Sequence, residues 1–268
     1  MKQLLKRTLL AAAPEWTTGL LSARARAHSH RKVRAWRLNL LTEKLLAALG
    51  PFVQSGPFRG MKLTPMSFKE HLGPFLLGTY EFELHPWIAQ LAGGQYSQLI
   101  DVGSKFGYYA VGLARLFPEI PMVAFDTDWW ARAACREMAS ENRTPNVQVA
   151  GFCSPCWLDR NLMHSSMILS DCEGYEADLF TRSTSIALNS TMLIIETHDC
   201  MIPGVTEAIL RRFARSHQPA TVVADLETVP IPPVDLAFLT PDEARSALRE
   251  IRPQQTWLLL TPNARPPR

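Results

Sequence analysis

Seven short apolar runs recur along the chain between residues 97 and 261, and stretches with a helical pattern separate most of them. Runs of roughly four to eight apolar residues between helices are typical of strands that are buried on both faces of a parallel sheet. The predicted strands are Ser97–Asp101, Met122–Asp126, Asn146–Phe152, Met167–Asp171, Met192–Thr197, Thr221–Asp225 and Thr256–Thr261.

The segments around these runs carry apolar residues at the three- and four-residue spacing of amphipathic helices. The predicted helices are Glu81–Ala92, Tyr108–Phe117, Trp129–Asn142, Tyr175–Leu188, Val205–His217 and Pro241–Ile251. The alternation of strands and helices predicts an α/β fold, in which helices cover both faces of a mainly parallel sheet.

The first fifty residues are helix-prone, with leucines at helical spacing. The breaker pair Gly50–Pro51 ends this part, and the Gly- and Pro-rich stretch Pro51–Pro74 is expected to form a loop or short hairpin. We therefore expect a basic, helical N-terminal extension with its linker over residues 1–75 and one α/β domain over residues 76–268.

Charge is unevenly distributed along the chain. Residues 1–37 carry nine Lys and Arg against the single acid Glu15, whereas the whole chain sums to +3 and the remainder therefore to about −5. A basic arm of this kind can rest on a partner, on an anionic surface or on its own domain. Nucleic acid is less well supported as a partner, because Trp36 is the only aromatic residue near the densest basic run, Arg31–Arg37.

Export and membrane insertion are not expected. The chain has no run of eighteen apolar residues, and the apolar core Thr8–Ala13 near its start is too short for a signal peptide. The five cysteines are an odd number, unlike a disulfide scaffold. The lone C-S-P-C pair, Cys153 and Cys156, lacks the further ligands of a structural zinc site. We expect a cytoplasmic protein with reduced thiols.

A glycine turn follows the first predicted strand in the stretch Leu99–Gly112, which reads LIDVGSKFGYYAVG. Strand, glycine turn and helix in this order form nucleotide sites in α/β proteins, because backbone at glycine can approach a ligand closely. Lys105 stands where the G-x-G-x-x-G dinucleotide fingerprint has its middle glycine. The D-x-G-x-x-x-G pattern of Asp101, Gly103 and Gly107 instead resembles motif I of class I S-adenosylmethionine-dependent methyltransferases. An ordinary strand–helix turn is the alternative interpretation.

Asp126 ends the second predicted strand, 23 residues after Gly103. A carboxylate at this distance can accept hydrogen bonds from both hydroxyls of a ribose, which favours a nucleoside site. An NAD-dependent dehydrogenase places an acid in the same way, so this residue alone leaves an oxidoreductase open. Asp128 is the competing acid, and its position before a helix that starts at Trp129 also suits an N-cap.

Acidic residues follow the fourth and fifth predicted strands, in D-C-E-G-Y-E from Asp171 and in E-T-H-D from Glu196. The carboxyl ends of central strands face the ligand crevice of such sheets. His198 is the candidate general base, because its ordinary pKa of about 6.5 lets it accept a proton at neutral pH, with Glu196 or Asp199 orienting the imidazole. The alternatives are a solvated loop, a structural histidine, or a magnesium ion held by Asp171, Glu196 and Asp199.

Several motifs taken together resemble the FkbM-type methyltransferases. They are L-G-T-Y-E-F-E-L before the first strand, D-V-G-x-x-x-G-Y-Y, an acid after the second strand, D-C-E-G-Y-E, and E-T-H-D-x-x-x-P-G, and they span roughly Leu76 to His217. The resemblance implies a Rossmann-like class I methyltransferase fold with a seven-stranded, mostly parallel sheet whose final strand is antiparallel. It also implies S-adenosylmethionine as cofactor and O-methylation of a sugar or small natural-product hydroxyl.

The resemblance also implies roles for individual residues. Asp171, Glu196 and His198 would be catalytic at the transfer site, with Glu173 beside them. The cofactor-binding residues would be Glu81, Asp101, Gly103, Ser104, Gly107, Asp126, Thr127 and Asp171. Asp126 would hold the ribose. A metal is not among the implied groups, and magnesium stays the alternative described above.

Lys105 and Phe106 depart from the family pattern, which has a small or amide residue between the glycines. A lysine there could repel the sulfonium, point outward or hold an acidic substrate. Three other functions stay open: a non-catalytic methyltransferase-like scaffold that binds through the basic arm, an RNA methyltransferase whose arm tracks phosphates, and an NAD-linked oxidoreductase. An N-P-P-[YF] motif for amino methylation does not follow the fourth strand. A small-molecule acceptor is therefore favoured over nucleic acid.

Overall fold

The computed structural model describes residues 40–69, 72–226, 228 and 230–263. The chain divides into two compact units, Met1–Ala48 and Leu49–Arg268. The basic arm expected over residues 1–37 lies outside the described residues, and the expected domain boundary between residues 75 and 76 stays a prediction. Within the described part of the chain, no helix is both long enough and apolar enough to cross a bilayer.

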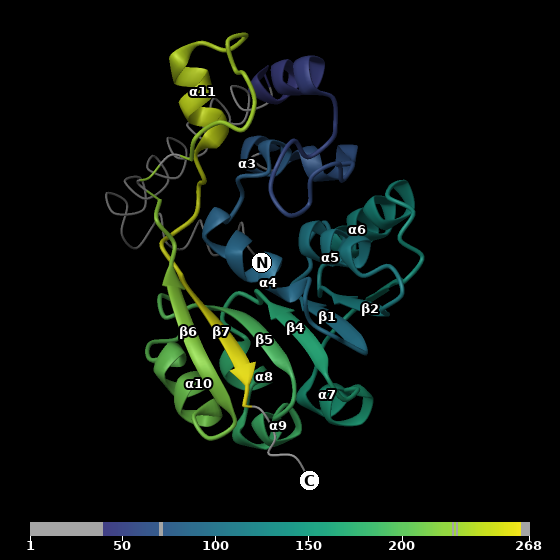
Figure 1. Cartoon of the computed structure of the whole chain (residues 1–268), viewed down its shortest axis with the longest axis vertical. Helices are drawn as coiled ribbons and strands as arrows, with labels where there is room; N and C mark the ends of the chain where they lie inside the picture. Colours follow the sequence, from purple (N-terminus) through teal and green to yellow (C-terminus); the bar gives the residue numbers. More distant parts are fainter. Residues whose placement is uncertain (1–39, 70–71, 227, 229, 264–268) are drawn as a thin grey trace, which may run out of the picture. The chain divides into compact units, whose positions relative to one another are not determined.

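Seven strands of the second unit form one mixed sheet in the order β3-β2-β1-β4-β5-β7-β6 (Figure 1). The strands are β1 (Gln98–Val102), β2 (Met122–Phe125), β3 (Val147–Ala150), β4 (Ser166–Ser170), β5 (Met192–Thr197), β6 (His217–Val223) and β7 (Thr256–Pro262). Strands β1 to β5 pair in parallel, whereas β7 is antiparallel to both β5 and β6. This order and the antiparallel β7 confirm the expected Rossmann-like class I methyltransferase fold.

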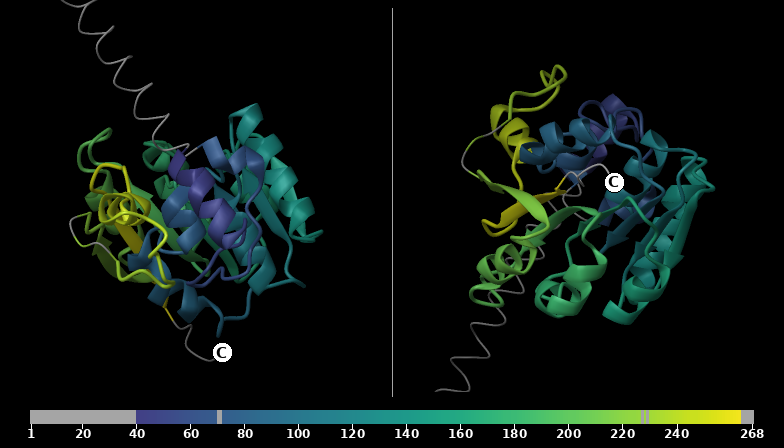
Figure 2. Two further views of the ribbon diagram at one scale, coloured as in Figure 1. Left: turned by 90° about the horizontal axis from the view of Figure 1, so that it is seen from above. Right: turned by 60° about the horizontal axis from the view of Figure 1, so that its bottom comes forward.

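Helices cover both faces of this sheet, as Figures 1 and 2 show. The helical elements are η1 (Pro65–Lys69), α3 (Leu72–Leu77), η2 (Phe82–Leu84), α4 (His85–Leu91), α5 (Tyr108–Leu116), α6 (Trp129–Glu141), α7 (Pro155–Asn161), α8 (Glu176–Leu179), α9 (Arg182–Ala187), α10 (Val205–Phe213) and α11 (Pro241–Leu248). Helix α5 packs on α6, and on the other face α7 packs on α9 and α10 on α8.

The buried core explains why the strands are nearly continuous apolar runs. Every residue of β1 and β4 is buried, because helices enclose these central strands on both sides. One core cluster joins alternate residues of the strands, such as Ile100 and Ile168, to Leu158 of α7 and Ile209 of α10. The outermost strand β6 is largely exposed instead, and it contains Pro219, a residue tolerated at a sheet edge.

Three expected elements differ from the observed ones, and one observed helix was not expected. The helix expected over Tyr175–Leu188 is two helices, α8 and α9, because the Thr181 side chain accepts from the backbone of Thr184 and begins a new helix. Helix α10 ends at Phe213, and the chain enters β6 at His217, four residues earlier than expected. Helix α7 is an element that was not expected, although Ser154 is its N-cap and a proline follows at N1.

The segment between Gly50 and α4 lies along the main domain rather than forming a free linker. Phe52 and Lys62 form an antiparallel bridge, which is the expected short hairpin. The backbone N–H of Lys62 donates to the Asn142 side chain at 2.8 Å, and the Asn142 amide donates back to the Lys62 carbonyl at 2.8 Å. Helix α3 packs on α11. A segment that precedes all the strands therefore meets a segment between β6 and β7, above the carboxyl edge of the sheet.

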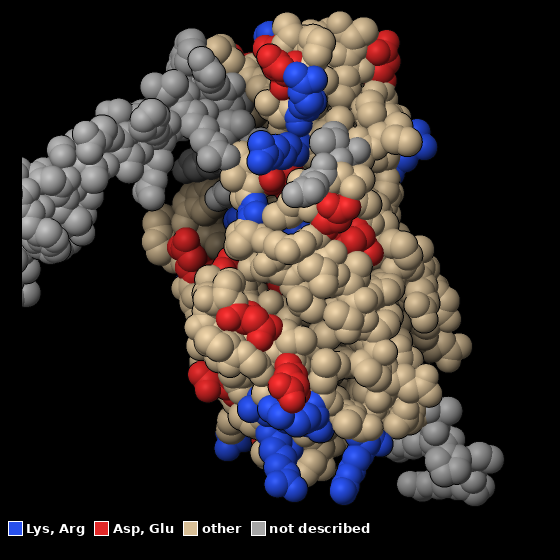
Figure 3. All heavy atoms as spheres, turned by 90° about the vertical axis from the view of Figure 1, so that its left-hand side faces the viewer, with Lys and Arg blue, Asp and Glu red and all other residues tan. Residues whose placement is uncertain are grey.

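Basic side chains gather at one end of the face that Figure 3 presents, where α10 turns into β6. Helix α10 carries Arg211 and Arg212 in its last turn, where the helix dipole favours cations. Arg212 donates to the backbone carbonyls of Ala177 and Phe180 at 2.9 and 2.7 Å. Arg211 pairs with Glu207 at 2.8 Å. These side chains therefore hold the helix layer together and are not all available to a partner.

Candidate functional site

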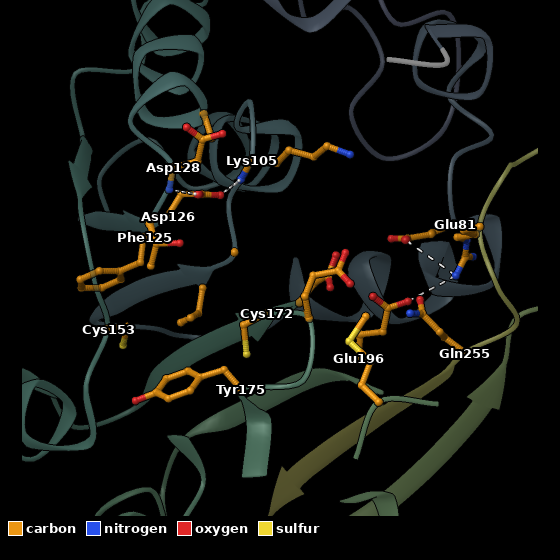
Figure 4. Close-up of a pocket in the computed structure, with 18 of the residues that line it drawn as sticks. Glu81, Lys105, Phe125, Asp126, Asp128, Cys153, Cys172, Tyr175, Glu196 and Gln255 are labelled. Carbon is orange, nitrogen blue, oxygen red and sulfur yellow. Dashed lines mark hydrogen bonds and ion pairs between the residues drawn. The ribbon is translucent and has the colours of Figure 1, made fainter. Parts of the chain in front are cut away.

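A cavity of about 820 Å³ lies at the carboxyl ends of β1, β2, β4 and β5 (Figure 4). Its walls also include the segment before α4 and the excursion of the chain between β6 and β7. The acids that line it are Glu81, Asp126, Asp128, Asp171, Glu173, Glu196 and Glu250, and the bases are Lys105 and Arg252. Acidic side chains thus outnumber basic ones among the described residues that line the cavity.

The structure brings most, but not all, of the expected site residues to the cavity. The expected residues that line it are Glu81, Gly103, Asp126, Thr127, Asp171, Glu173 and Glu196. The expected residues that lie behind its walls are Asp101, Ser104, Gly107 and His198. These four buried residues can act on a ligand only through the side chains that line the cavity.

The two glycines of the turn are required by packing. Gly103 has a φ of +90°, and a Cβ built on it would lie 1.6 Å from the carbonyl oxygen of Asp171. Gly107 has a φ of +93°, and its Cβ would lie 2.8 Å from Cys135 Sγ. Both positions therefore exclude larger residues. The glycine pattern sets how tightly the turn fits between β2 and β4, and the case for a ligand rests on other groups.

Asp101 supports the turn from below. Its side chain is buried and accepts a hydrogen bond from the backbone N–H of Ala110. Helix α5 has Gly107 as N-cap, which offers no side chain, so Asp101 reaches across from β1 to satisfy the first turn. Burial, reinforced by the negative charge of Asp171, raises the pKa of Asp101 to about 8.

Asp126 is fixed on the cavity wall by two loops. The backbone N–H of Lys105 donates to its Oδ2, and the backbone N–H of Asp128 donates to its Oδ1, each at 2.8 Å. Asp128 itself accepts from the backbone of Trp130 at 2.8 Å, which confirms it as the N-cap of α6. The Lys105 side chain points away from the Asp126 carboxylate (Figure 4).

An apolar wall continues from Asp126 along the cavity. Phe125 and Cys153 belong to it, and the rings of Phe152 and Tyr175 lie 5.2 Å apart. Phe152 is 56% exposed, which is unusual for so large an apolar side chain. An aromatic wall beside a fixed carboxylate can accept a flat base.

His198 is fully buried behind the other end of the cavity. Its Nδ1 lies 2.7 Å from Glu176 Oε1, and its Nε2 lies 3.5 Å from Asp171 Oδ1 and 3.6 Å from Glu196 Oε2. Burial alone would lower the pKa of His198, but the Glu176 hydrogen bond and the nearby carboxylates outweigh it and raise this pKa. Glu176 therefore orients the imidazole. It takes the role that the sequence suggested for Glu196 or Asp199.

Gln255 and Asp199 differ in how they relate to these acids. With its amide nitrogen directed at Glu196, Gln255 donates to both carboxylate oxygens, and its oxygen accepts a hydrogen bond from His198 Nε2 at 3.0 Å. Asp199 points elsewhere: it accepts from Gly204 N at 2.9 Å and from the Thr206 hydroxyl, before α10. The magnesium set of Asp171, Glu196 and Asp199 is therefore not brought together.

Arg252 connects three parts of the chain around the cavity. Its guanidinium donates to Glu250 Oε2 at 2.6 Å, to Glu196 Oε1 at 3.4 Å and to Glu83. Glu81 lies beside it, 3.9 Å from Nη1, and accepts from the Tyr109 hydroxyl. Burial raises the pKa of Glu81 to about 8, against the lowering effect of Arg252.

Sequence reasoning missed Glu176, Glu250, Arg252 and Gln255. Glu176 stands within the D-C-E-G-Y-E motif, so the motif itself contained the signal. The other three lie between α11 and the start of β7, outside the stretch that resembles the family, and have no local pattern of their own.

The class I fold implies S-adenosylmethionine as cofactor, and the residues present fit that group. Asp126 offers a fixed carboxylate for the ribose, and Phe125, Phe152 and Tyr175 offer a flat apolar wall for the adenine. A cavity of about 820 Å³ falls within the range of small-molecule sites, roughly 300–1,000 Å³. The acidic surroundings also suit a ligand with a sulfonium and an ammonium group.

No model of a protein family matches the chain, and no curated protein matches it in sequence. The FkbM-type family therefore stays a resemblance of motifs.

Several solved structures share this fold at low identity. One is the O-methyltransferase TomG from Streptomyces achromogenes, involved in tomaymycin synthesis and solved with SAM, at 14% identity over 84% of this chain and 89% of that one, with a TM-score of 0.43. Another is the Bacillus cereus O-methyltransferase with SAH, at 13% over 84% and 90%, TM-score 0.42. A Streptococcus thermophilus rRNA methylase matches at 14% over 66% and 95%, TM-score 0.42. Similarity at this level concerns the fold alone.

Proposed function

We propose that the protein is an S-adenosylmethionine-dependent methyltransferase that methylates a hydroxyl group of a small molecule. The observation that carries the proposal is the position of Asp126. It directly follows β2 of a class I sheet, its carboxylate is fixed by two backbone N–H groups, and it faces a cavity of suitable size. An acid at this place accepts the hydroxyls of a ribose.

The cofactor would lie along the carboxyl ends of β1, β2 and β4. Asp126 would accept the ribose hydroxyls, and the wall with Phe152 would cover the adenine. Glu81 and Asp171, on the far side of Gly103, would face the methionine end and its positive charges. The cofactor supplies an activated methyl group, and the protein supplies its orientation toward the acceptor.

The charge of the cavity supports a small acceptor rather than RNA. Seven acids and two bases line it, so phosphate groups would be repelled at the point of transfer. Carboxylates also accept hydrogen bonds from the hydroxyls of a sugar or other polyol. The excursion that carries Glu250 to Gln255 closes this half of the cavity and would select the acceptor.

An acceptor hydroxyl must lose its proton to attack the methyl group. Asp171 and Glu196 line the cavity where β4 and β5 end, and His198 lies directly behind them. These three residues are the groups that would accept that proton or weaken its bond to the acceptor oxygen. The fully buried His198 would act through the two carboxylates in front of it rather than by touching the acceptor.

Calorimetric titration of the purified protein with S-adenosylmethionine tests the proposal. We expect saturable binding, and we expect Asp126→Asn to weaken it about 10- to 100-fold, the loss of one charged hydrogen-bond acceptor. Asp128→Asn is the matched control: asparagine is an equally good N-cap, so affinity should stay within about twofold. Equal melting temperatures would show that both variants fold.

Failure of the parent chain to bind S-adenosylmethionine at millimolar concentration would refute the proposal and favour the non-catalytic scaffold. Binding that Asp126→Asn leaves unchanged would refute the assignment of the ribose site. Transfer of a labelled methyl group to polyols but not to RNA would support the small acceptor, and transfer to RNA alone would reject it.

A further inference from the structure

Three side chains at the ends of β4 and β5 point their donor atoms at one common space. They are Asp171, Glu196 and His198, and one donor atom of each lies within 4.8 Å of those of the other two. His198 Nε2 is 3.5 Å from Asp171 Oδ1 and 3.6 Å from Glu196 Oε2. These separations are too long for hydrogen bonds. Donors that share one ion at about 2.1 Å lie about 3.0–3.5 Å apart, which is close to the separations from Nε2.

The imidazole is held in the orientation that a metal ligand needs. Glu176 Oε1 lies 2.7 Å from Nδ1, and both side chains are fully buried. A carboxylate on Nδ1 fixes the ring plane, and Nε2 turns its lone pair to an ion once the proton that it donates to the Gln255 oxygen is displaced. This carboxylate–histidine pair is an observation independent of the acids in front of it, because Glu176 comes from α8 and does not face the common space itself.

Few basic side chains lie near the acids in front of the imidazole. Asp171 Oδ1 has no accessible surface and no hydrogen-bond partner among the described residues. Glu196 is 2% exposed, and its one charged partner besides the histidine is Arg252, at 3.4 Å, which is shared with Glu83 and Glu250. A buried carboxylate without a counter-charge is costly. A cation between Asp171, Glu196 and His198 removes that cost.

We propose that Asp171, Glu196 and His198 bind a divalent first-row transition metal ion, with Glu176 as the positioning residue of the histidine. The donor set differs from the all-oxygen set that the sequence suggested, because Asp199 is turned toward α10 and His198 takes its place. Magnesium prefers oxygen ligands only, whereas an imidazole favours metals later in the row. The Gln255 amide oxygen, 3.0 Å from Nε2, is a further oxygen donor at the same place.

The ion would supply Lewis-acid chemistry that lowers the pKa of a bound hydroxyl. That use of the site rests on the proposed methyl transfer, but binding of the ion does not. The two can therefore fail separately: cofactor binding is measured in the presence of a chelator, and metal binding is measured without cofactor.

Electron paramagnetic resonance of Mn²⁺ titrated into the chelator-treated full chain tests the site. We expect one bound Mn²⁺ per chain, an affinity that rises from Mn²⁺ to Co²⁺ in competition, and at least tenfold weaker binding of Mg²⁺. His198→Gln should weaken Mn²⁺ binding at least tenfold, and Glu176→Gln about 10- to 100-fold. Asp199→Asn is the control that separates the two donor sets, and it should bind Mn²⁺ like the parent.

Three results would overturn the proposal. They are the absence of saturable Mn²⁺ binding at millimolar concentration, a Mg²⁺ affinity equal to that of Mn²⁺, and loss of binding in Asp199→Asn with retention in His198→Gln. Circular dichroism of each variant checks folding. If His198→Gln does not fold, the conservative Asp171→Asn, whose side chain is partly exposed, provides the same readout and should weaken Mn²⁺ binding at least tenfold.

Discussion

Asp101 gives a sharp test of the buried electrostatics beneath the turn of Gly103 and Gly107. Burial raises its pKa from the ordinary 3.8 to about 8, so the folded chain keeps this carboxyl protonated at neutral pH. In the unfolded chain it ionises near pH 4. Between these values the unfolded state binds fewer protons, so this residue's contribution to stability is complete below about pH 4 and declines as the pH rises to about 8.

The expected size of the effect follows from the two pKa values. At 1.36 kcal/mol per pH unit, the shift from 3.8 to about 8 corresponds to roughly 6 kcal/mol. Asp101→Asn removes the titration but keeps a side-chain oxygen for the Ala110 N–H. The unfolding free energy of the variant, relative to that of the parent, should therefore increase by about 1.4 kcal/mol per pH unit between pH 5 and 8.

Urea denaturation of both proteins at several pH values, followed by tryptophan fluorescence, measures this difference. Because all other titrating groups are common to both proteins, they largely cancel in the comparison. A difference that stays constant from pH 5 to 8 would show that Asp101 is ionised in the folded chain and would refute the reasoning.

Three further outcomes are expected, each checked by thermal or urea denaturation. Gly103→Ala should destabilise the fold by more than about 3 kcal/mol, because its Cβ would overlap the Asp171 carbonyl, whereas Gly151→Ala meets open space and should be neutral. Arg252→Met should cost about 3–5 kcal/mol, because it leaves buried carboxylates without their cation; a loss below 1 kcal/mol would contradict this. Thr240→Ala should cost about 1 kcal/mol through loss of the α11 capping box, and an unchanged midpoint would contradict it.

The fold was largely predictable because its signals are local. Buried parallel strands are apolar runs, and β5 was placed at its observed bounds, Met192–Thr197. Strand order came from the motif resemblance, since pairing is not visible in any single run. The division of Tyr175–Leu188 into two helices depends on a single threonine cap, which propensity does not reveal.

The candidate site was predictable only where residues follow strand ends. Asp126, Asp171 and Glu196 reach the cavity because the carboxyl ends of neighbouring strands meet at one edge. Side-chain direction could not be predicted in the same way. Adjacent His198 and Asp199 point to different partners, and this depends on Glu176 and on the loop before α10.

The place of β7 in the sheet has a consequence for synthesis on the ribosome. Strand β6 pairs only with β7, and β7 also covers the edge of β5, so the apolar β5 keeps an open edge until the last strand has emerged. Arg252, which lies 169 residues after Glu83, arrives at the same late stage. A nascent chain therefore keeps an edge open to intermolecular strand pairing until β7 has emerged, and the edge is covered at the same stage as Arg252 reaches the cavity.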